Sequence, residues 1–175
     1  MGSSAVIREL PGSQLRSFLR ICVVWDLDST LARTSQRHWM LDRIRAGDAD
    51  WDDYAMECVG DDPAEGPVQL MRLMPQYRHV IISGRSARAV DLTVSWLSSH
   101  QVPADELRLA PPGGCPPGGA FKVSEIRAIQ AEGREVLLVV EDFAEAAALI
   151  RQETGIPVLG ITQFYPVQVP AGHAL

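Results

Sequence analysis

The stretch ICVVWDLDST, residues 21–30, decides the fold class of this chain. Its first half, residues 21–25, is a continuous apolar run rich in β-branched side chains, which is typical of a strand buried on both faces of a parallel sheet. Its second half places Asp26 and Asp28 directly after that strand. Two carboxylates held so close together are unfavourable without a cation or a shared proton. The pattern therefore indicates a functional site rather than an acidic surface turn.

Four later segments repeat this apolar character and alternate with segments of helical periodicity. The further predicted strands cover residues 79–83, 107–110, 136–140 and 157–161. The predicted helices cover residues 65–77, 86–100, 121–133 and 142–155. Strands that alternate with helices of this length predict an α/β fold with a central parallel sheet and right-handed crossovers.

Residues 31–64 do not fit this alternation and predict a small helical insertion after the first strand. Residues 31–47 have helical character, and the acidic residues 48–63 contain Trp51 and Tyr54. Ligands of open α/β sheets bind at the carboxyl ends of the strands. We therefore expect the insertion to lie over that edge as a small cap.

The chain of 175 residues is long enough for one domain with such an insertion. We expect a leader over residues 1–20, a core domain over 21–165 with the insertion at about 31–64, and a tail over 166–175. No apolar run nears the ~20 residues that span a bilayer, and the N-terminus lacks a secretory signal pattern. The three cysteines form no CxxC pair. These features favour a cytoplasmic protein with no membrane partner.

The formal net charge of -6 weakens the case for tight, sequence-independent nucleic-acid binding, which depends on basic patches. It suits an enzyme that gathers carboxylates around a divalent cation. A local basic stripe stays open, made by Arg33, Arg37, Arg43, Arg45, Arg85 and Arg88. The alternative is that these arginines pair with acids of the insertion, namely Asp48, Asp50, Asp52 and Asp53.

Polar residues also follow later predicted strands. Ser83 and Gly84 follow the second strand, where a hydroxyl and main-chain N–H groups suit a phosphate oxygen. Lys122 opens a helix after a loop rich in proline and glycine. Glu141 and Asp142 end the fourth strand, and Asp142 is a candidate ligand for Mg²⁺.

The chain order of these features resembles the haloacid dehalogenase superfamily of phosphotransferases. The matching motifs are DLDST at 26–30, ISG at 82–84, Lys122, and ED at 141–142. The resemblance covers about residues 21–161. It implies a three-layer Rossmann-like fold with strand order 5-4-1-2-3, counted along the predicted strands. It also implies a Mg²⁺-dependent phosphomonoester hydrolase.

The resemblance assigns a role to each matching residue. Asp26 would attack phosphorus and form an aspartyl-phosphate, and Asp28 would act first as general acid and then as general base. Ser83 and Lys122 would neutralise and orient the phosphoryl group. The cofactor Mg²⁺ would be held by Asp26, Asp142 and the main-chain carbonyl of Asp28. The residues expected to bind substrate are Thr30, Gly84, Arg85 and Arg37.

A closer pattern is similar to phage-type proteins related to the 3′-phosphatase domain of polynucleotide kinase-phosphatase. Its matching residues are Arg37, Trp51, Tyr54, Asp62, Pro67, Arg85 and Trp96. This similarity implies a nucleic-acid 3′-phosphate end as substrate. Two positions depart from it, because Ser29 stands where glycine is common and Phe143 stands where arginine often follows the acidic pair.

Two other functions stay open from the sequence. The first is a nucleotidase or other small-molecule phosphatase, in which Trp39, Trp51 and Tyr54 stack on a base or sugar. The second is a binding module that has lost catalysis, which predicts damage to a catalytic position. Every one of the matched catalytic positions is intact.

Overall fold

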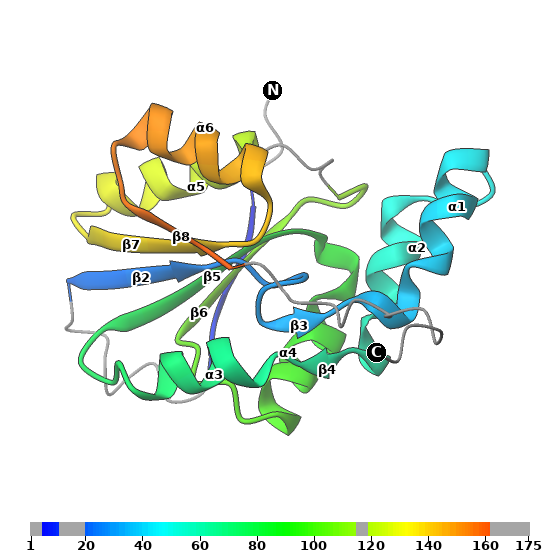
Figure 1. Cartoon of the computed structure of the whole chain (residues 1–175), viewed down its shortest axis with the longest axis horizontal. Helices are drawn as coiled ribbons and strands as arrows, with labels where there is room; N and C mark the ends of the chain where they lie inside the picture. Colours follow the sequence, from blue (N-terminus) through cyan, green and yellow to red (C-terminus); the bar gives the residue numbers. More distant parts are fainter. Residues whose placement is uncertain (1–4, 11–19, 115–118, 162–175) are drawn as a thin grey trace, which may run out of the picture.

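The computed structural model describes residues 5–10, 20–114 and 119–161, and its centre is a six-stranded sheet (Figure 1). The strands are β1 (Val6–Glu9), β2 (Ile21–Trp25), β5 (Arg78–Ser86), β6 (Glu106–Ala110), β7 (Glu135–Glu141) and β8 (Val158–Gly160). Their order in the sheet is β1-β6-β5-β2-β7-β8. The five strands that the sequence predicted are mutually parallel and lie in the predicted order.

Helices cover both faces of this sheet, which gives the three layers visible in Figure 1. They are α3 (Glu65–Arg72), α4 (Val90–Ser99), α5 (Ala120–Ala131) and α6 (Ala144–Thr154). Side chains of β2 alternate between the two cores: Val23 and Trp25 pack with α3 and α4, whereas Val24 packs with α5 and α6. No helix in the described part of the chain is long and apolar enough to cross a membrane.

The sheet is mixed rather than wholly parallel, because β1 pairs antiparallel with β6. Val6 lies opposite Leu109, and Glu9 lies opposite Glu106. The sequence pattern predicts a leader here and no strand. The segment VIRE is short and largely exposed, so it lacks the apolar run that marks a buried strand. Its pairing covers the edge of β6, which an open sheet would otherwise expose.

The small helical insertion is present, and an antiparallel strand pair closes its base. The pair consists of β3 (Ala32–Arg33) and β4 (Asp62–Pro63), and the helices between them are α1 (Trp39–Ala46) and α2 (Trp51–Met56). The helix expected from residue 31 begins only at Trp39, because Leu31 ends a turn in which its N–H donates to the carbonyl of Leu27, and Ala32 and Arg33 form β3. The Asp50 and Asp53 side chains form a capping box at the start of α2.

The insertion lies beyond the layers, beside the carboxyl ends of the parallel strands (Figure 1). The side chain of Asp52 in α2 connects it to the core. One carboxylate oxygen accepts a hydrogen bond from the N–H of Gly113 at 2.7 Å, and the other accepts one from Arg88 at 3.2 Å. The predicted tail at residues 166–175 lies outside the described residues.

Candidate active site

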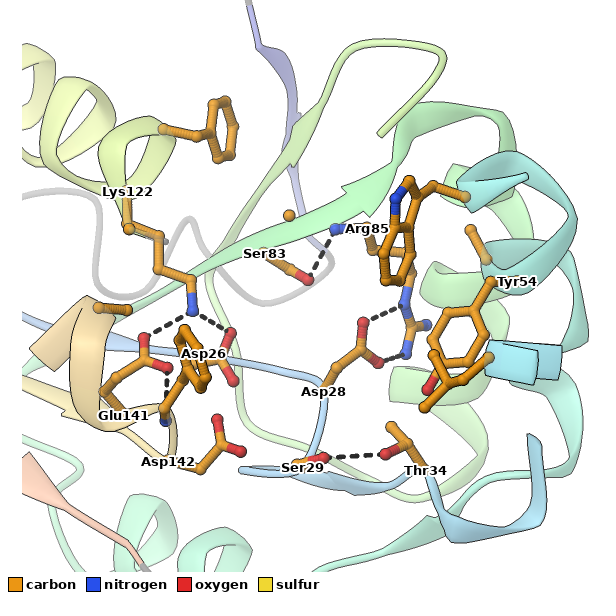
Figure 2. A pocket seen from close by; sticks show the side chains of 18 of the residues that line it. Asp26, Asp28, Ser29, Thr34, Tyr54, Ser83, Arg85, Lys122, Glu141 and Asp142 are labelled. Atoms are coloured by element: carbon orange, nitrogen blue, oxygen red, sulfur yellow. Dashed lines mark hydrogen bonds and ion pairs between the residues drawn. The ribbon is translucent and has the colours of Figure 1, made fainter. Parts of the chain in front are cut away.

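A cavity of about 370 Å³ lies between the strand ends and the insertion. The predicted site residues that line it are Asp26, Asp28, Ser83, Gly84, Arg85, Lys122 and Asp142. The other two predicted residues, Thr30 and Arg37, lie behind this lining and contact Asp142 and Asp28 respectively. Segments far apart in the chain therefore bring one set of polar groups together, as Figure 2 shows.

Lys122 joins the two acids at the ends of β2 and β7. Its ammonium group donates to Oδ1 of Asp26 at 2.7 Å and to Oε2 of Glu141 at 2.6 Å. Burial raises the pKa of Asp26 above its ordinary value, against the opposing charge of Lys122. Burial alone would lower the pKa of Lys122, but Asp26 and Glu141 outweigh it and hold that pKa above its ordinary value. Lys122 therefore stays protonated. It is the only lysine in the sequence.

A glycine sets the position of the helix that carries Lys122. Gly119 caps α5 with a φ of 85°, in the left-handed region that favours glycine. A Cβ atom there would lie 2.8 Å from the Cα of Ala146. The loop rich in proline and glycine therefore ends at a position where α5 can begin in direct contact with α6.

Three carboxylates gather beside the lysine and offer oxygen ligands. One oxygen from each of Asp26, Glu141 and Asp142 lies within 4.8 Å of the others. Burial and the charge of Glu141 raise the pKa of Asp142 to about 6. Both oxygens of Glu141 are engaged, one by Lys122 and one by the N–H of Phe143 at 3.1 Å. Hard oxygen donors in this arrangement fit Mg²⁺, with Asp26 and Asp142 as the better placed ligands.

Asp28 lies in a second charged group, which contains two arginines. Arg37 and Arg85 each place an Nη2 atom 2.5 Å from Oδ1 of Asp28. Burial alone would raise the pKa of Asp28, but the two guanidinium groups outweigh it and hold the pKa well below its usual range. Ser83, whose hydroxyl accepts a hydrogen bond from the N–H of Arg85, lies between this group and the Lys122 group in Figure 2.

Arg37 supports Asp28 from behind and is almost fully buried. Its side chain is 2% exposed, its Nη1 donates to the carbonyl of Tyr54 at 3.0 Å, and its guanidinium lies 4.2 Å from the centre of the Tyr54 ring. Its remaining donors bind Asp28 and Asp61. The sequence predicted a substrate contact for Arg37, whereas the structure places it against another side chain of the site.

Asp61 is a member of this group that the sequence analysis missed. Its side chain is 1% exposed and binds Arg37 through both carboxylate oxygens. In the sequence it is one of many acids in the insertion, and the neighbouring Asp62 was the one matched to a family pattern. Only the burial of Asp61 distinguishes it, and an acidic run gives no signal of burial.

The predicted basic stripe is largely paired. Arg37 and Arg85 are buried against Asp28 and Asp61. The partners of the other arginines are Asp42 for Arg45, Asp52 for Arg88 and the Asp48 carbonyl for Arg43. Among the described residues, only Asp52 of the four acids expected as partners forms an ion pair with one of these arginines, and Asp48 contributes only its main-chain carbonyl.

Aromatic side chains form the outer walls of the cavity. Trp51 and Tyr54 of α2 line it and pack edge to face, with ring centres 5.7 Å apart. Phe121 and Phe143 line it from the core domain. Trp39 lies outside the lining and is 53% exposed. Of the three aromatic residues that the sequence grouped together, Trp51 and Tyr54 therefore line the cavity and Trp39 does not.

Solved structures of known proteins share this arrangement of strands and helices, although no family model and no curated protein matches the sequence. A chain of a Pnkp1/Rnl/Hen1 complex matches with a TM-score of 0.63 and 18% identity, over 83% of this chain and 47% of that one. A chain of a Pnkp1/Rnl/Hen1 RNA repair complex matches with a TM-score of 0.59 and 17% identity, over 93% of this chain and 47% of that one. The class C acid phosphatase from Bacillus anthracis matches with a TM-score of 0.56 and 16% identity, over 83% of this chain and 67% of that one.

The fold is the three-layer Rossmann-like α/β fold of these solved structures, which include a class C acid phosphatase. The resemblance drawn from the four motifs is thus confirmed for the fold. This chain spans about half the length of the two Pnkp1/Rnl/Hen1 chains that it matches.

Proposed function

We propose that this chain is a Mg²⁺-dependent phosphomonoester hydrolase that forms an aspartyl-phosphate on Asp26. The observation that carries the proposal is the pairing of buried Asp26 with Lys122, next to Asp142 and in a cavity that Asp28 and Ser83 also line. A buried carboxylate beside a fixed ammonium group is suited to attack a phosphoryl group whose charge the ammonium also attracts. The fold, which is shared with a known acid phosphatase, supports the same chemistry.

In the first half-reaction, a carboxylate oxygen of Asp26 attacks phosphorus while the bond from phosphorus to the leaving oxygen breaks. Asp28 gives the leaving oxygen its proton. Lys122 and the hydroxyl of Ser83 bind the phosphoryl oxygens and orient them. A phosphate dianion beside Asp28 raises the pKa of that carboxyl, which opposes the effect of the two arginines and lets it carry the proton.

In the second half-reaction, Asp28 removes a proton from water, and the water oxygen attacks phosphorus. The bond from phosphorus to Asp26 breaks, inorganic phosphate leaves, and both aspartates return to their starting states. Asp26, Asp142 and the carbonyl of Asp28 would hold Mg²⁺, which when bound neutralises the charge that a carboxylate meets at a phosphate. Glu141 holds Lys122 in place through a 2.6 Å hydrogen bond.

The aromatic walls favour a nucleoside as the leaving group. Trp51 and Tyr54 from the insertion and Phe121 from the core domain offer ring surfaces on which a base can stack. A nucleic-acid 3′-phosphate end presents such a nucleoside, and similarity to a chain of an RNA repair complex supports this substrate. A free nucleotide is the second candidate, because the paired arginines leave few cations to bind further phosphates of a polynucleotide.

The test is phosphate release with and without Mg²⁺ by wild type and Asp26→Asn. The substrates are p-nitrophenyl phosphate, nucleoside 5′- and 3′-monophosphates, and oligonucleotides with a 3′-phosphate. Metal-dependent release that Asp26→Asn abolishes is the expected result. Preference for the oligonucleotide selects end processing, and preference for a mononucleotide selects the second candidate. A folded wild type that binds no Mg²⁺ and releases no phosphate would overturn the proposal and favour a binding module.

A further inference from the structure

Asp61 forms the most extensive contact with Arg37. Nε of Arg37 donates to Oδ1 and Oδ2 of Asp61 at 3.0 and 3.1 Å, and Nη2 donates to Oδ2 at 2.7 Å. Both side chains are almost fully buried, with 2% of Arg37 and 1% of Asp61 exposed. A pair held by several charge-assisted hydrogen bonds has a fixed geometry. The orientation of the Arg37 guanidinium is therefore set by Asp61.

The same guanidinium reaches the proposed acid and base. Nη2 of Arg37 binds both Oδ2 of Asp61 and Oδ1 of Asp28. Nη2 of Arg85 contacts the same oxygen of Asp28 and lies 3.5 Å from Asp61. Two arginines that shared one carboxylate would repel each other in a buried site. With Asp61 present, two positive and two negative groups balance.

The main chain of Asp61 is itself fixed by two parts of the molecule. Its carbonyl accepts a 2.7 Å hydrogen bond from the indole N–H of Trp96 in the core helix α4. Its N–H donates to the carbonyl of Cys58 within the insertion. Asp61 is therefore held by both the core and the insertion. Its side chain in turn holds Arg37, which contacts Asp28.

We propose that Asp61 is a positioning residue for the hydrolysis: it holds Arg37 so that the carboxyl group of Asp28 is directed at the leaving oxygen. The inference rests on the proposed function. Without Asp61, Arg37 loses three hydrogen bonds and the two arginines move apart, and Asp28 moves with them. A displacement of about 1 Å in a catalytic group costs about 100-fold in rate.

The effect of displacing Asp28 on the rate depends on the leaving group. This dependence distinguishes a positioning role of Asp61 from a general loss of structure. An alkoxide needs the proton of Asp28 as it leaves, whereas p-nitrophenolate leaves without one. The value of kcat/KM covers the steps up to release of the leaving group. Displacing Asp28 therefore lowers kcat/KM for an alkyl phosphate more than for p-nitrophenyl phosphate.

The experiment compares Asp61→Asn with wild type on glycerol phosphate and p-nitrophenyl phosphate in Mg²⁺. We expect kcat/KM for the alkyl ester to fall about 100-fold. For the aryl ester, we expect a fall of about tenfold or less. Asp62→Asn is the matched control, because Asp62 is the next residue, is exposed and bonds to Gln36 instead of an arginine. The control retains wild-type values on both esters.

A second variant, Trp96→Phe, keeps the inference testable if Asp61→Asn does not fold. Trp96→Phe keeps an aromatic ring but removes the hydrogen bond to the Asp61 carbonyl, and we expect a smaller loss with the same selectivity for the alkyl ester. Where Asp61→Asn folds, Arg37→Gln is tested alone and combined with it. The loss of kcat/KM in the double variant should be no greater than that in the more damaging single variant, because both residues act through one contact.

Equal losses on the two esters in folded Asp61→Asn and Trp96→Phe, or additive losses in the double variant, would overturn the inference and leave the hydrolase intact. A folded wild type that is inactive on both esters would overturn the proposed function, and this inference with it.

Discussion

The ammonium group of Lys122 lies 2.7 Å from Oδ1 of Asp26, although 96 residues separate the two in the chain. The close contact of Gly119 with α6 positions the start of α5, which carries the lysine. Once there, it balances part of the negative charge of Asp26, Glu141 and Asp142. One cation thus allows three acids to share a buried edge of the sheet.

Lys122→Met removes this cation from among three carboxylates. We expect kcat/KM for hydrolysis to fall about 100-fold or more, because the phosphoryl oxygens lose a charged partner. Mg²⁺ should bind at least as tightly as in wild type, since the opposing positive charge is gone. Steady-state assays and isothermal titration with Mg²⁺ measure the two effects. Near-normal hydrolysis by the variant would contradict the role given to Lys122.

Gly119→Ala should damage both stability and activity. The new Cβ would meet the main chain of Ala146 at 2.8 Å, and alanine disfavours a φ of 85°. We expect a loss of about 1–3 kcal/mol in the free energy of unfolding, together with lower kcat because α5 carries Lys122. Gly66→Ala is the control, since a Cβ there has open space within helix α3 and should be neutral or slightly stabilising. Equal behaviour of the two variants in urea titrations would count against this account of α5.

Trp51→Ala should raise KM for nucleoside phosphates. The ring lines the cavity beside Tyr54, so its loss removes a stacking surface worth about 1–3 kcal/mol per base. Hydrolysis of glycerol phosphate, which has no ring to stack, should change little. Trp39→Ala is the matched control because Trp39 lies outside the cavity lining. If both tryptophan variants raise KM equally, the proposed stacking wall is wrong.

Glu106→Gln should destabilise the protein in a way that depends on pH. Glu106 is 1% exposed and binds Arg108, Arg134 and Arg78. Burial alone would raise its pKa, but Arg134 and Arg108 outweigh burial and lower the pKa from 4.5 to about 2. A lowered carboxyl pKa stabilises the fold above the unfolded value of 4.5, by about 3 kcal/mol.

That stabilisation is lost as the pH falls from 4.5 through about 2. The difference in the free energy of unfolding between wild type and Glu106→Gln should therefore be constant near neutral pH and shrink in acid. Urea titrations across this range measure it, with the exposed Glu135→Gln as control. A difference that grows on acidification would have the wrong sign for a buried carboxylate paired with arginines.

The strands that carry the site could be predicted because their signal is local. The run ICVVW is buried on both faces from its second residue on, as its apolar character indicates, and Asp26 follows it directly. Parallel strands bring their carboxyl ends to one edge, so placing Asp26, Ser83 and Asp142 together needed only the order of the strands. Strand β1 was missed because exposed residues at a sheet edge pair through their main chain, which leaves no apolar pattern in the sequence.

The partners within the site were harder to predict because burial decides them. Arg37 and Asp61 are both charged residues of an insertion rich in charges, and no spacing indicates that they are buried together. The turn after β2 shows a similar limit: Ser29 adopts a φ of 65°, a conformation that favours glycine, and its hydroxyl bonds to Thr34 at 2.8 Å. The sequence marked Ser29 as a departure from the family pattern but gave no indication of this bond.

The central claim is that Asp26 carries the phosphoryl group during turnover. The most direct test stops the reaction of a ³²P-labelled phosphomonoester with acid in the presence of Mg²⁺, and maps any label on the protein. The account predicts an acyl phosphate that hydroxylamine removes, located in the peptide that contains Asp26 and missing from Asp26→Asn. Turnover with no labelled protein at any quench time, or with the label on another residue, would contradict it.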